Sequence, residues 1–219
     1  MIKFYLDVWG DYALFSRPEM KVERVSYDII TPSAARGILE AIYWHPGIKY
    51  EIDKIFVLNK IQFTNIRRNE VSQKISAQNV AKFIKSKKGE LYLATSEMRT
   101  QRAAMVLKDV HYIIETRVSF FSSVGEQDNF LKIYNILERR LTKGQYYHTP
   151  YFGTREFPAN FKLCENIQEV KTAYPNEVKD LGFMLYDMDY SDKENIRPMF
   201  FRAILENGIM SVKSPEVFR

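Results

Sequence analysis

The chain opens with a segment in which hydrophobic positions alternate with polar ones. Phe4, Leu6 and Val8 occupy every second position within residues 2–8. A period of two is typical of a strand that buries one face. Gly10 follows, and we expect it to end this strand, because glycine inside a strand pattern weakens it.

A helical pattern comes next, and residues with specific backbone preferences mark its ends. Thr31 fits the N-cap and Pro32 the first helical position, where a missing backbone N–H has little cost. Apolar residues at 35, 38, 39 and 42 form one stripe, and the Pro-Gly pair at 46–47 ends the helix. Tyr43 lies at its end. The loop between the strand and the helix carries Arg17, Lys21 and Arg24. A strand, a basic loop and a helix ending in tyrosine suit the handling of phosphate or RNA.

The remaining periodicity predicts a mixture of strands and helices. Between 64 and 89 the chain is polar and basic, so we expect a loop or an insertion there. Asn207-Gly208 is a two-residue hairpin signal. Strands are expected at 49–63 (one long strand or a pair), 91–94, 106–121, 183–190 and 199–205, and helices at 79–86 and 128–142.

The order of these elements predicts an α+β fold. A β-α-β unit, an insertion, a second β-α-β unit and a β-rich tail match a ferredoxin-like β-α-β-β-α-β core. We expect one domain over 1–166, with a basic hairpin or loop insertion at about 64–104. Residues 167–219 are expected to form a small β-rich C-terminal domain with an antiparallel sheet.

Composition narrows the class of protein. The 219 residues are 46% hydrophobic and 14% aromatic, enough for a folded core. No apolar run reaches the roughly 18 residues of a membrane helix, and the start has no signal-peptide pattern, so we expect a cytoplasmic protein without membrane contact. The lone Cys164 excludes an intrachain disulfide and a cysteine-clustered zinc site. The three histidines show no metal-binding spacing, and no metal or cofactor is predicted.

Positive charge is concentrated in one part of the chain. Residues 60–108 hold eleven Lys or Arg and three Glu, a net charge of +8, whereas the whole chain carries +5. Such a segment favours a polyanionic partner whose binding weakens with salt. A solvated basic face is the alternative interpretation.

Four stretches of the chain resemble a known family. They are GDYALFSRPEMKVERVSYDIITPSAARGILEAIYWHP (10–46), TQRAAMVLKDVHYIIE (100–115), KGQYYHTPYFGTREFPANF (143–161) and LGFMLYDMDY (181–190). In this order they resemble the CRISPR-associated family 5 proteins of type I-C systems, the Dvulg subtype, which are RAMP endoribonucleases. The resemblance implies a RAMP ferredoxin-like domain with a β-hairpin insertion and a small C-terminal sheet.

The resemblance also implies an activity and partners. The expected reaction is metal-independent cleavage of CRISPR precursor RNA at the repeat stem-loop, by 2′-OH attack that leaves a 2′,3′-cyclic phosphate. The protein would then stay on the 5′ handle of the mature CRISPR RNA. Its expected protein partners are the backbone and large subunits of the type I-C surveillance complex.

Metal-independent RNA cleavage needs groups that orient the 2′-OH, stabilise charge on phosphorus and protonate the leaving oxygen. The resemblance places Tyr43 and Lys132 on the family's catalytic tyrosine and lysine. At least one family member has a histidine after that lysine, where this chain has Ile133. His45 and His148 are candidate replacements for this acid or base. From the residues alone, Tyr43 also fits a buried helix-end aromatic and Lys132 a solvated helix lysine.

Further basic residues are candidates for RNA contact. In 146–157, aromatic side chains, His148 and Arg155 surround Pro150 and Gly153, which suits single-stranded RNA or, alternatively, a tightly packed turn. Trp44 is interpreted as a core residue, with a base-stacking platform as the alternative. The predicted RNA-binding residues are Arg17, Lys21, Arg24, Arg67, Arg68, Arg99, Arg102, Lys108 and Arg155.

Two other functions stay open. Ile133 is compatible with a non-catalytic subunit that only binds the 5′ handle of CRISPR RNA. The basic surface is also compatible with DNA binding or metal-dependent nicking. No Walker A or G-x-G-x-x-G motif is present, so a nucleotide-hydrolysing or dinucleotide-binding enzyme is not supported.

Overall fold

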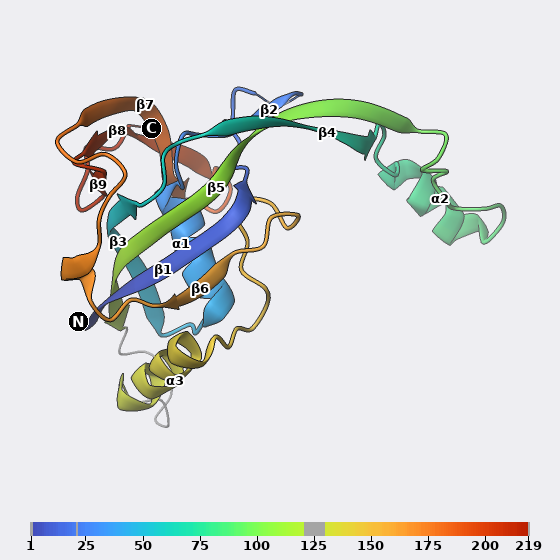
Figure 1. Cartoon of the computed structure of the whole chain (residues 1–219). Helices are drawn as coiled ribbons and strands as arrows, with labels where there is room; N and C mark the ends of the chain where they lie inside the picture. The colour runs from blue at the N-terminus through green and yellow to red at the C-terminus, as the bar shows by residue number, and fades with distance from the viewer. Residues whose placement is uncertain (1, 21, 121–129, 219) are drawn as a thin grey trace.

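The computed structural model describes residues 2–20, 22–120 and 130–218 of the chain (Figure 1). Within them it is an α+β protein in which strands dominate. The elements are β1 (Ile2–Ala13), β2 (Arg24–Val25), α1 (Pro32–Ile42), β3 (Ile48–Val57), β4 (Phe63–Val71), α2 (Ala77–Ser86), β5 (Arg99–Phe120), α3 (Phe130–Lys143), β6 (Asn160–Leu163), the 3₁₀ helix η1 (Ile167–Glu169), β7 (Val178–Asp189), β8 (Arg197–Glu206) and β9 (Ile209–Ser211).

The strands form one curled sheet in the order β6-β1-β5-β3-β9-β8-β7, and each neighbouring pair in this order is antiparallel. In its centre, Leu6 of β1 and Ile55 of β3 both lie opposite Ile114 of β5. All three side chains are fully buried. This row of aliphatic residues belongs to the core, on which α1 packs (Figure 1).

Helix α1 forms as its sequence signals predict. The Thr31 side chain accepts a hydrogen bond from the Ala34 N–H at 3.2 Å, and Pro32 takes the first helical position. The predicted apolar stripe is buried. Tyr43 then takes an extended conformation with φ −150°, so the helix ends there. The predicted cap and the place of Tyr43 at the helix end are confirmed, and the helix stops before the Pro46-Gly47 pair that was expected to end it.

Strand β1 is longer than predicted, because Gly10 does not end it. The strand continues to Ala13, and Gly10 pairs with Val110 of β5. A Cβ at Gly10 would lie 3.0 Å from both the Phe152 ring and the Pro158 carbonyl oxygen. Glycine is needed here for the close approach of the segment after α3, so the prediction of a strand break was wrong.

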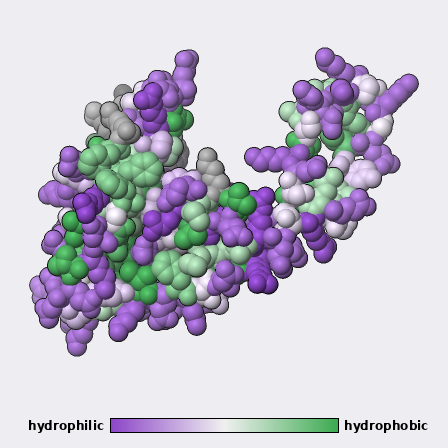
Figure 2. Space-filling model, turned by 90° about the horizontal axis from the view of Figure 1, so that it is seen from above, coloured by the Kyte–Doolittle hydropathy of each residue, from purple (hydrophilic) through white to green (hydrophobic). Residues whose placement is uncertain are grey.

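Strand β5 has two parts with different surroundings. Its second half lies between β1 and β3 in the sheet, whereas its first half pairs with β4 and leaves the body of the protein (Figure 1). We call this projecting part, residues 63–105 with α2 at its tip, the arm. None of the α2 residues is buried. Seen from above, the arm stands apart from the body and its surface is mostly hydrophilic (Figure 2).

The structure of the arm differs from three sequence-based expectations. The strand predicted at 49–63 ends at Val57, and the polar segment expected as a loop or insertion from residue 64 begins within β4 (Phe63–Val71). Residues 91–94 form no strand. The helix expected at 79–86 is present as α2. Strand β4 lacks a clear apolar pattern because none of its residues is buried, and pairing with β5 makes it a strand.

The C-terminal strands are antiparallel, as expected, and continue the main sheet. Strand β9 pairs with β3, so hydrogen bonding runs without interruption from β3 into β9, β8 and β7. Asn207 and Gly208 have φ values of 53° and 75° and join β8 to β9, which confirms the hairpin signal. The expected helix at 128–142 is α3 from Phe130 onward, and residues 128 and 129 lie outside the described residues.

Candidate functional site

A cavity of about 500 Å³ lies where the C-terminal end of α1 meets α3 and the segment after it. It brings together Tyr43 and His148, two residues singled out from the sequence that lie far apart along the chain. Its lining residues are Glu40, Tyr43, Trp44, Arg140, Tyr147 and His148.

Hydrogen bonds to the last carbonyl groups of α1 build this cavity. The backbone N–H groups of Tyr147 and His148 donate to the Ala41 carbonyl at 3.0 and 3.2 Å. Arg140 Nη1 donates to the Ile42 carbonyl at 2.6 Å. The last carbonyl groups of a helix have no partner within it, so these contacts satisfy them and fix the later segment against α1.

Tyr43 is held on several sides. Only 8% of its surface is exposed, and the Tyr50 hydroxyl donates to its backbone carbonyl at 2.6 Å. Burial is the main cause that raises the pKa of Tyr50 far above its usual value, and the nearby Tyr43 and Glu40 raise it further. Tyr50 therefore stays a protonated donor. The Arg140 guanidinium lies 5.0 Å from the centre of the Tyr43 ring. This cation favours negative charge that develops beside Tyr43.

The two candidate histidines differ in their surroundings. His148 is exposed and lines the cavity, and its ring lies 5.8 Å from that of Tyr147. The His45 ring stacks beside Tyr43 at 6.4 Å, and its Nδ1 accepts a hydrogen bond from the Gly47 N–H at 3.1 Å. The Gly47 contact makes His45 part of the turn after α1, so His148 is the histidine better placed for chemistry.

The structure does not bring Lys132 into the Tyr43 cavity. Lys132 is exposed on α3 and lines a shallow hollow of about 460 Å³ with Leu131, Asn135, Ile136 and Arg139. The next residue, Ile133, is 4% exposed and packs in the core. The side chain at that position therefore points inward, away from solvent.

Several predicted RNA-binding arginines are paired with acids. Arg17 lies 2.7 Å from Asp28 and 4.6 Å from the Tyr27 ring centre, so it supports the loop that carries it. Arg24, Arg68 and Arg102 converge on Glu70, at 2.9, 3.8 and 3.8 Å. Arg68 also lies 2.7 Å from Glu156.

The register of the arm explains this division. Arg68 lies opposite Arg102, so their side chains share one face of the β4–β5 ribbon with Glu70. Arg67 and Arg99 point to the other face, where both are exposed. Lys108 and Arg155 are exposed as well, and Lys21 lies outside the described residues.

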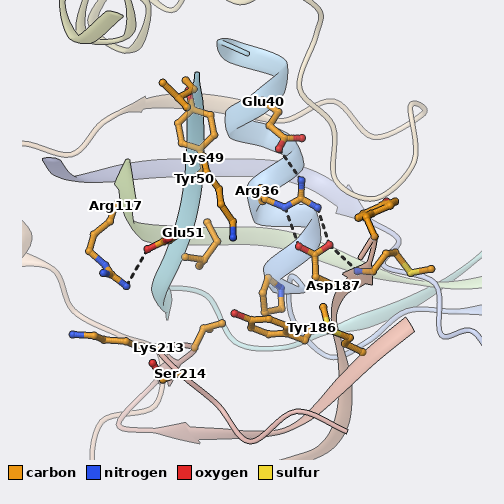
Figure 3. Close-up of a pocket in the computed structure, with 17 residues that line it drawn as sticks. Arg36, Glu40, Lys49, Tyr50, Glu51, Arg117, Tyr186, Asp187, Lys213 and Ser214 are labelled. Carbon is orange, nitrogen blue, oxygen red and sulfur yellow. Dashed lines mark hydrogen bonds and ion pairs between the residues drawn. The ribbon is translucent and has the colours of Figure 1, made fainter. Parts of the chain in front are cut away.

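A second cavity, of about 530 Å³, lies between α1, β3 and β7 (Figure 3). Arg36 of α1 points across it to Asp187 of β7, with Nε–Oδ2 and Nη2–Oδ1 distances of 3.1 and 2.7 Å. Its Nη1 also binds Glu40 at 2.7 Å. The C-terminal strands thus hold α1, the helix that presents Tyr43.

Three cavity residues were missed or misjudged in the sequence. Trp44 is 62% exposed, so its interpretation as a core residue was wrong. Glu40 lies in the last turn of α1, four residues before Trp44, but Trp44 lies beyond the helix end at Ile42, so no helical spacing in the sequence links them. Arg140 lies in the last turn of α3, where cations are favoured, but its contact with α1 is a tertiary one.

The aromatic side chains of the segment 146–157 differ in burial: Tyr147 is 78% exposed, whereas Phe152 is fully buried.

The described residues hold neither a metal cluster nor a membrane-spanning helix. Within residues 2–20, 22–120 and 130–218, no three His, Cys, Asp or Glu side chains are grouped so as to hold a metal ion. In the same part of the chain, no helix has the length and apolar character needed to cross a membrane.

The fold is that of known CRISPR-associated proteins. A crystal structure of a CRISPR-associated protein aligns with a TM-score of 0.72 and 22% identity, over 100% of this chain and 97% of the other. A functionally uncharacterized protein from Streptococcus mutans aligns with a TM-score of 0.70 and 21% identity, over the same shares of the two chains. A chain of a CRISPR RNA-guided surveillance complex aligns at 0.54 and 14% identity, covering 93% of this chain and 88% of the other.

The family follows from sequence. The family model described as CRISPR-associated protein (Cas_Cas5) matches residues 4–213, so the chain belongs to the Cas5 family. A CRISPR pre-crRNA endoribonuclease Cas5d of Mannheimia succiniciproducens is 48% identical, over 94% of this chain and 93% of that protein. A second protein of that name, from Thermus thermophilus, is 38% identical, over 100% and 96%.

Proposed function

We propose that this protein is a metal-independent endoribonuclease of a type I-C CRISPR system, acting in the cytoplasm on precursor CRISPR RNA at the repeat stem-loop. Two relatives, similar over nearly their whole length, carry the name of this activity. The observation that carries the proposal is the cavity in which Tyr43, Arg140 and His148 meet.

In the proposed reaction the 2′-OH attacks the adjacent phosphorus and the bond to the 5′-oxygen breaks. The products are a 2′,3′-cyclic phosphate and a 5′-OH. Tyr43 orients the 2′-OH or takes its proton, and His148 protonates the leaving oxygen. Arg140 stabilises charge on the phosphorane oxygens from within the cavity. Lys132 approaches the same RNA from the exposed face of α3.

We further propose that the core is a RAMP ferredoxin-like domain. Strands β1, β3, β5 and β6 with helices α1 and α3 follow in β-α-β-β-α-β order, and the antiparallel order β6-β1-β5-β3 supports this. In this scheme residues 1–166 form the nuclease domain, 64–104 its basic insertion and 167–219 the C-terminal domain.

Retention of the product is part of the proposal. The exposed cations Arg67, Arg99, Lys108 and Arg155 grip the RNA backbone, and phosphate contacts of this kind survive cleavage. The protein then stays on the 5′ handle of mature CRISPR RNA and joins the backbone and large subunits of a surveillance complex.

The second candidate function is a non-catalytic subunit that binds the 5′ handle. It is favoured by the buried Ile133, at the position where at least one family member has a histidine, and by Lys132, which lines a hollow other than the Tyr43 cavity. DNA binding or metal-dependent nicking by the basic surface is a third and weaker candidate.

One assay separates these functions. The purified protein is incubated, in EDTA and in a parallel arm with Mg²⁺, with its repeat RNA and with the same RNA carrying one 2′-deoxy nucleotide at the cut site. Cleavage of only the all-RNA substrate supports 2′-OH attack. Tight binding without cleavage supports the handle-binding subunit, and cleavage that requires a divalent ion supports nicking.

A further inference from the structure

Two large aromatic side chains at the Tyr43 cavity are exposed to solvent. Trp44 is 62% and Tyr147 is 78% exposed, and both line the cavity. Burying apolar surface contributes about 25 cal/mol per Å², and aromatic rings bury roughly 150–250 Å² each, so two exposed rings at one cavity mark a place where a ligand gains binding energy.

Both aromatic residues are carried by anchored backbone. Trp44 follows directly on Tyr43, whose carbonyl is bound by the Tyr50 hydroxyl. The Tyr147 N–H donates to the Ala41 carbonyl, which ties its loop to the end of α1. A ligand that binds these rings therefore orders little additional backbone, which lowers the entropic cost of binding.

A carboxylate lies at the same cavity. Glu40, in the last turn of α1, lines it, and Arg36 Nη1 donates a hydrogen bond to Glu40 Oε1 at 2.7 Å. An ionised carboxylate only accepts hydrogen bonds. It therefore favours a ligand with an amino edge, such as the exocyclic amino groups of adenine, cytosine or guanine.

We propose that Trp44 and Tyr147 form a stacking site for one unpaired nucleobase of the substrate RNA, next to the scissile phosphate, and that Glu40 accepts a hydrogen bond from its amino edge. The flat rings suit a base, whose π-face stacks on aromatic side chains. Arg140, at the same cavity, faces the adjoining phosphate. This inference rests on the proposed function, because it requires that RNA binds at Tyr43.

The stacked base has a consequence for the reaction. Tyr43 acts on a 2′-OH whose position depends on the conformation of its nucleotide. Fixing a neighbouring base against these rings restricts that conformation and aligns the 2′-OH with the phosphorus, which is the positional contribution to catalysis.

The experiment uses Trp44 as its own reporter. The chain has two tryptophans, so Trp9→Phe leaves Trp44 as the sole one. Titrating this variant with repeat RNA carrying a 2′-deoxy nucleotide at the cut site is expected to quench Trp44 fluorescence without cleavage. Repeat RNAs with a single abasic site on either side of the cut then identify the stacked position, where the missing base removes the quenching.

Cleavage gives the second readout. Trp44→Ala is expected to lower affinity and kcat/KM by about ten-fold, in line with the loss of one stacked base, and Trp44→Phe is expected to recover most of this. Tyr190→Ala is the matched control, because Tyr190 is 59% exposed but lines the other cavity. With the abasic RNA, Trp44→Ala should cause no further loss, since the partner base is already absent.

The outcomes separate the two proposals. Unchanged Trp44 fluorescence together with wild-type affinity and cleavage by Trp44→Ala would overturn the stacking site and leave the proposed function standing. A wild-type protein that neither binds nor cuts repeat RNA would overturn both. A protein that binds without cutting removes the nuclease proposal, and quenching at a single base position still supports the stacking site.

Discussion

The Tyr43 cavity and the arm differ in how their side chains are held in place. At the cavity, hydrogen bonds from Arg140, Tyr147 and His148 fix the last carbonyl groups of α1. On the arm, α2 buries no residue, and the cations Arg67 and Arg99 are exposed. Catalysis depends on the exact positions of its groups, so it needs side chains fixed as they are at the cavity. Binding of the RNA phosphates by charge works with exposed side chains such as those of the arm, because Coulomb attraction depends weakly on exact geometry.

The largest expected effect comes from Tyr43→Phe, which removes only the hydroxyl. The ring keeps its packing beside Arg140, so folding and RNA affinity should change little. The single-turnover cleavage rate should fall by about 100-fold or more, the size of a lost acid–base contribution. Rates are measured at saturating protein, and affinity with RNA that carries a 2′-deoxy nucleotide at the cut site. A large loss of affinity with an unchanged rate would contradict the assignment of chemistry to the cavity.

The next effect belongs to the arm and should appear in binding. Replacing both Arg67 and Arg99 by alanine is expected to weaken RNA affinity on the order of ten-fold at moderate salt. The slope of log affinity against log salt should fall by about 0.7–0.9 for each phosphate that is no longer neutralised, while the rate at saturation stays unchanged. Lys171→Ala with Lys193→Ala is the matched control, since both lysines are exposed and outside the predicted RNA surface. Equal effects of the two pairs would remove the arm from the RNA interface.

Tyr50→Phe tests whether the fixed backbone matters at the cavity. The change removes the donor to the Tyr43 carbonyl and leaves that acceptor without its partner. We expect a loss of about 1–3 kcal/mol in the free energy of unfolding, measured in urea, and a several-fold lower cleavage rate with little change in affinity. A stability loss without any change in rate would limit Tyr50 to folding.

The smallest effect concerns the ion pair that ties α1 to β7. Arg36 and Asp187 are each about 25% exposed at the side chain, so solvent screens part of their attraction. A double-mutant cycle with Arg36→Ala and Asp187→Ala should give a coupling free energy of about 1 kcal/mol in unfolding experiments. Additive effects of the two substitutions would show that the C-terminal strands hold α1 by packing alone.

The resemblance of the sequence to a known family identified that family and Tyr43, but it did not identify all residues of the cavity. Tyr43 and His148 were singled out from the sequence, and the structure places both at one cavity. Lys132 was singled out too, yet it lines a different hollow. Arg140 went unnoticed, because a cation in the last turn of a helix has an ordinary local explanation and its contact with α1 depends on how two helices meet.

The sequence by itself determined those elements whose signals are local. The Thr31 cap, the apolar stripe of α1 and the Asn207-Gly208 turn each depend on residues within a few positions of one another. The backbone preferences of Thr, Pro, Asn and Gly act at that range, so the α1 boundary and the β8–β9 hairpin were predicted correctly.

Only the tertiary structure decided the features that depend on distant partners. Gly10 remains in a strand because Phe152 packs against it, and β4 is a strand because β5 supplies its hydrogen bonds. Glu70 draws three predicted RNA-binding arginines to one face of the arm, since pairing alternates side chains between faces. Trp44 is exposed because it lies beyond the end of α1, where the apolar stripe of the helix no longer buries it. Local sequence carries no information on these contacts, which form only when segments far apart in the chain meet.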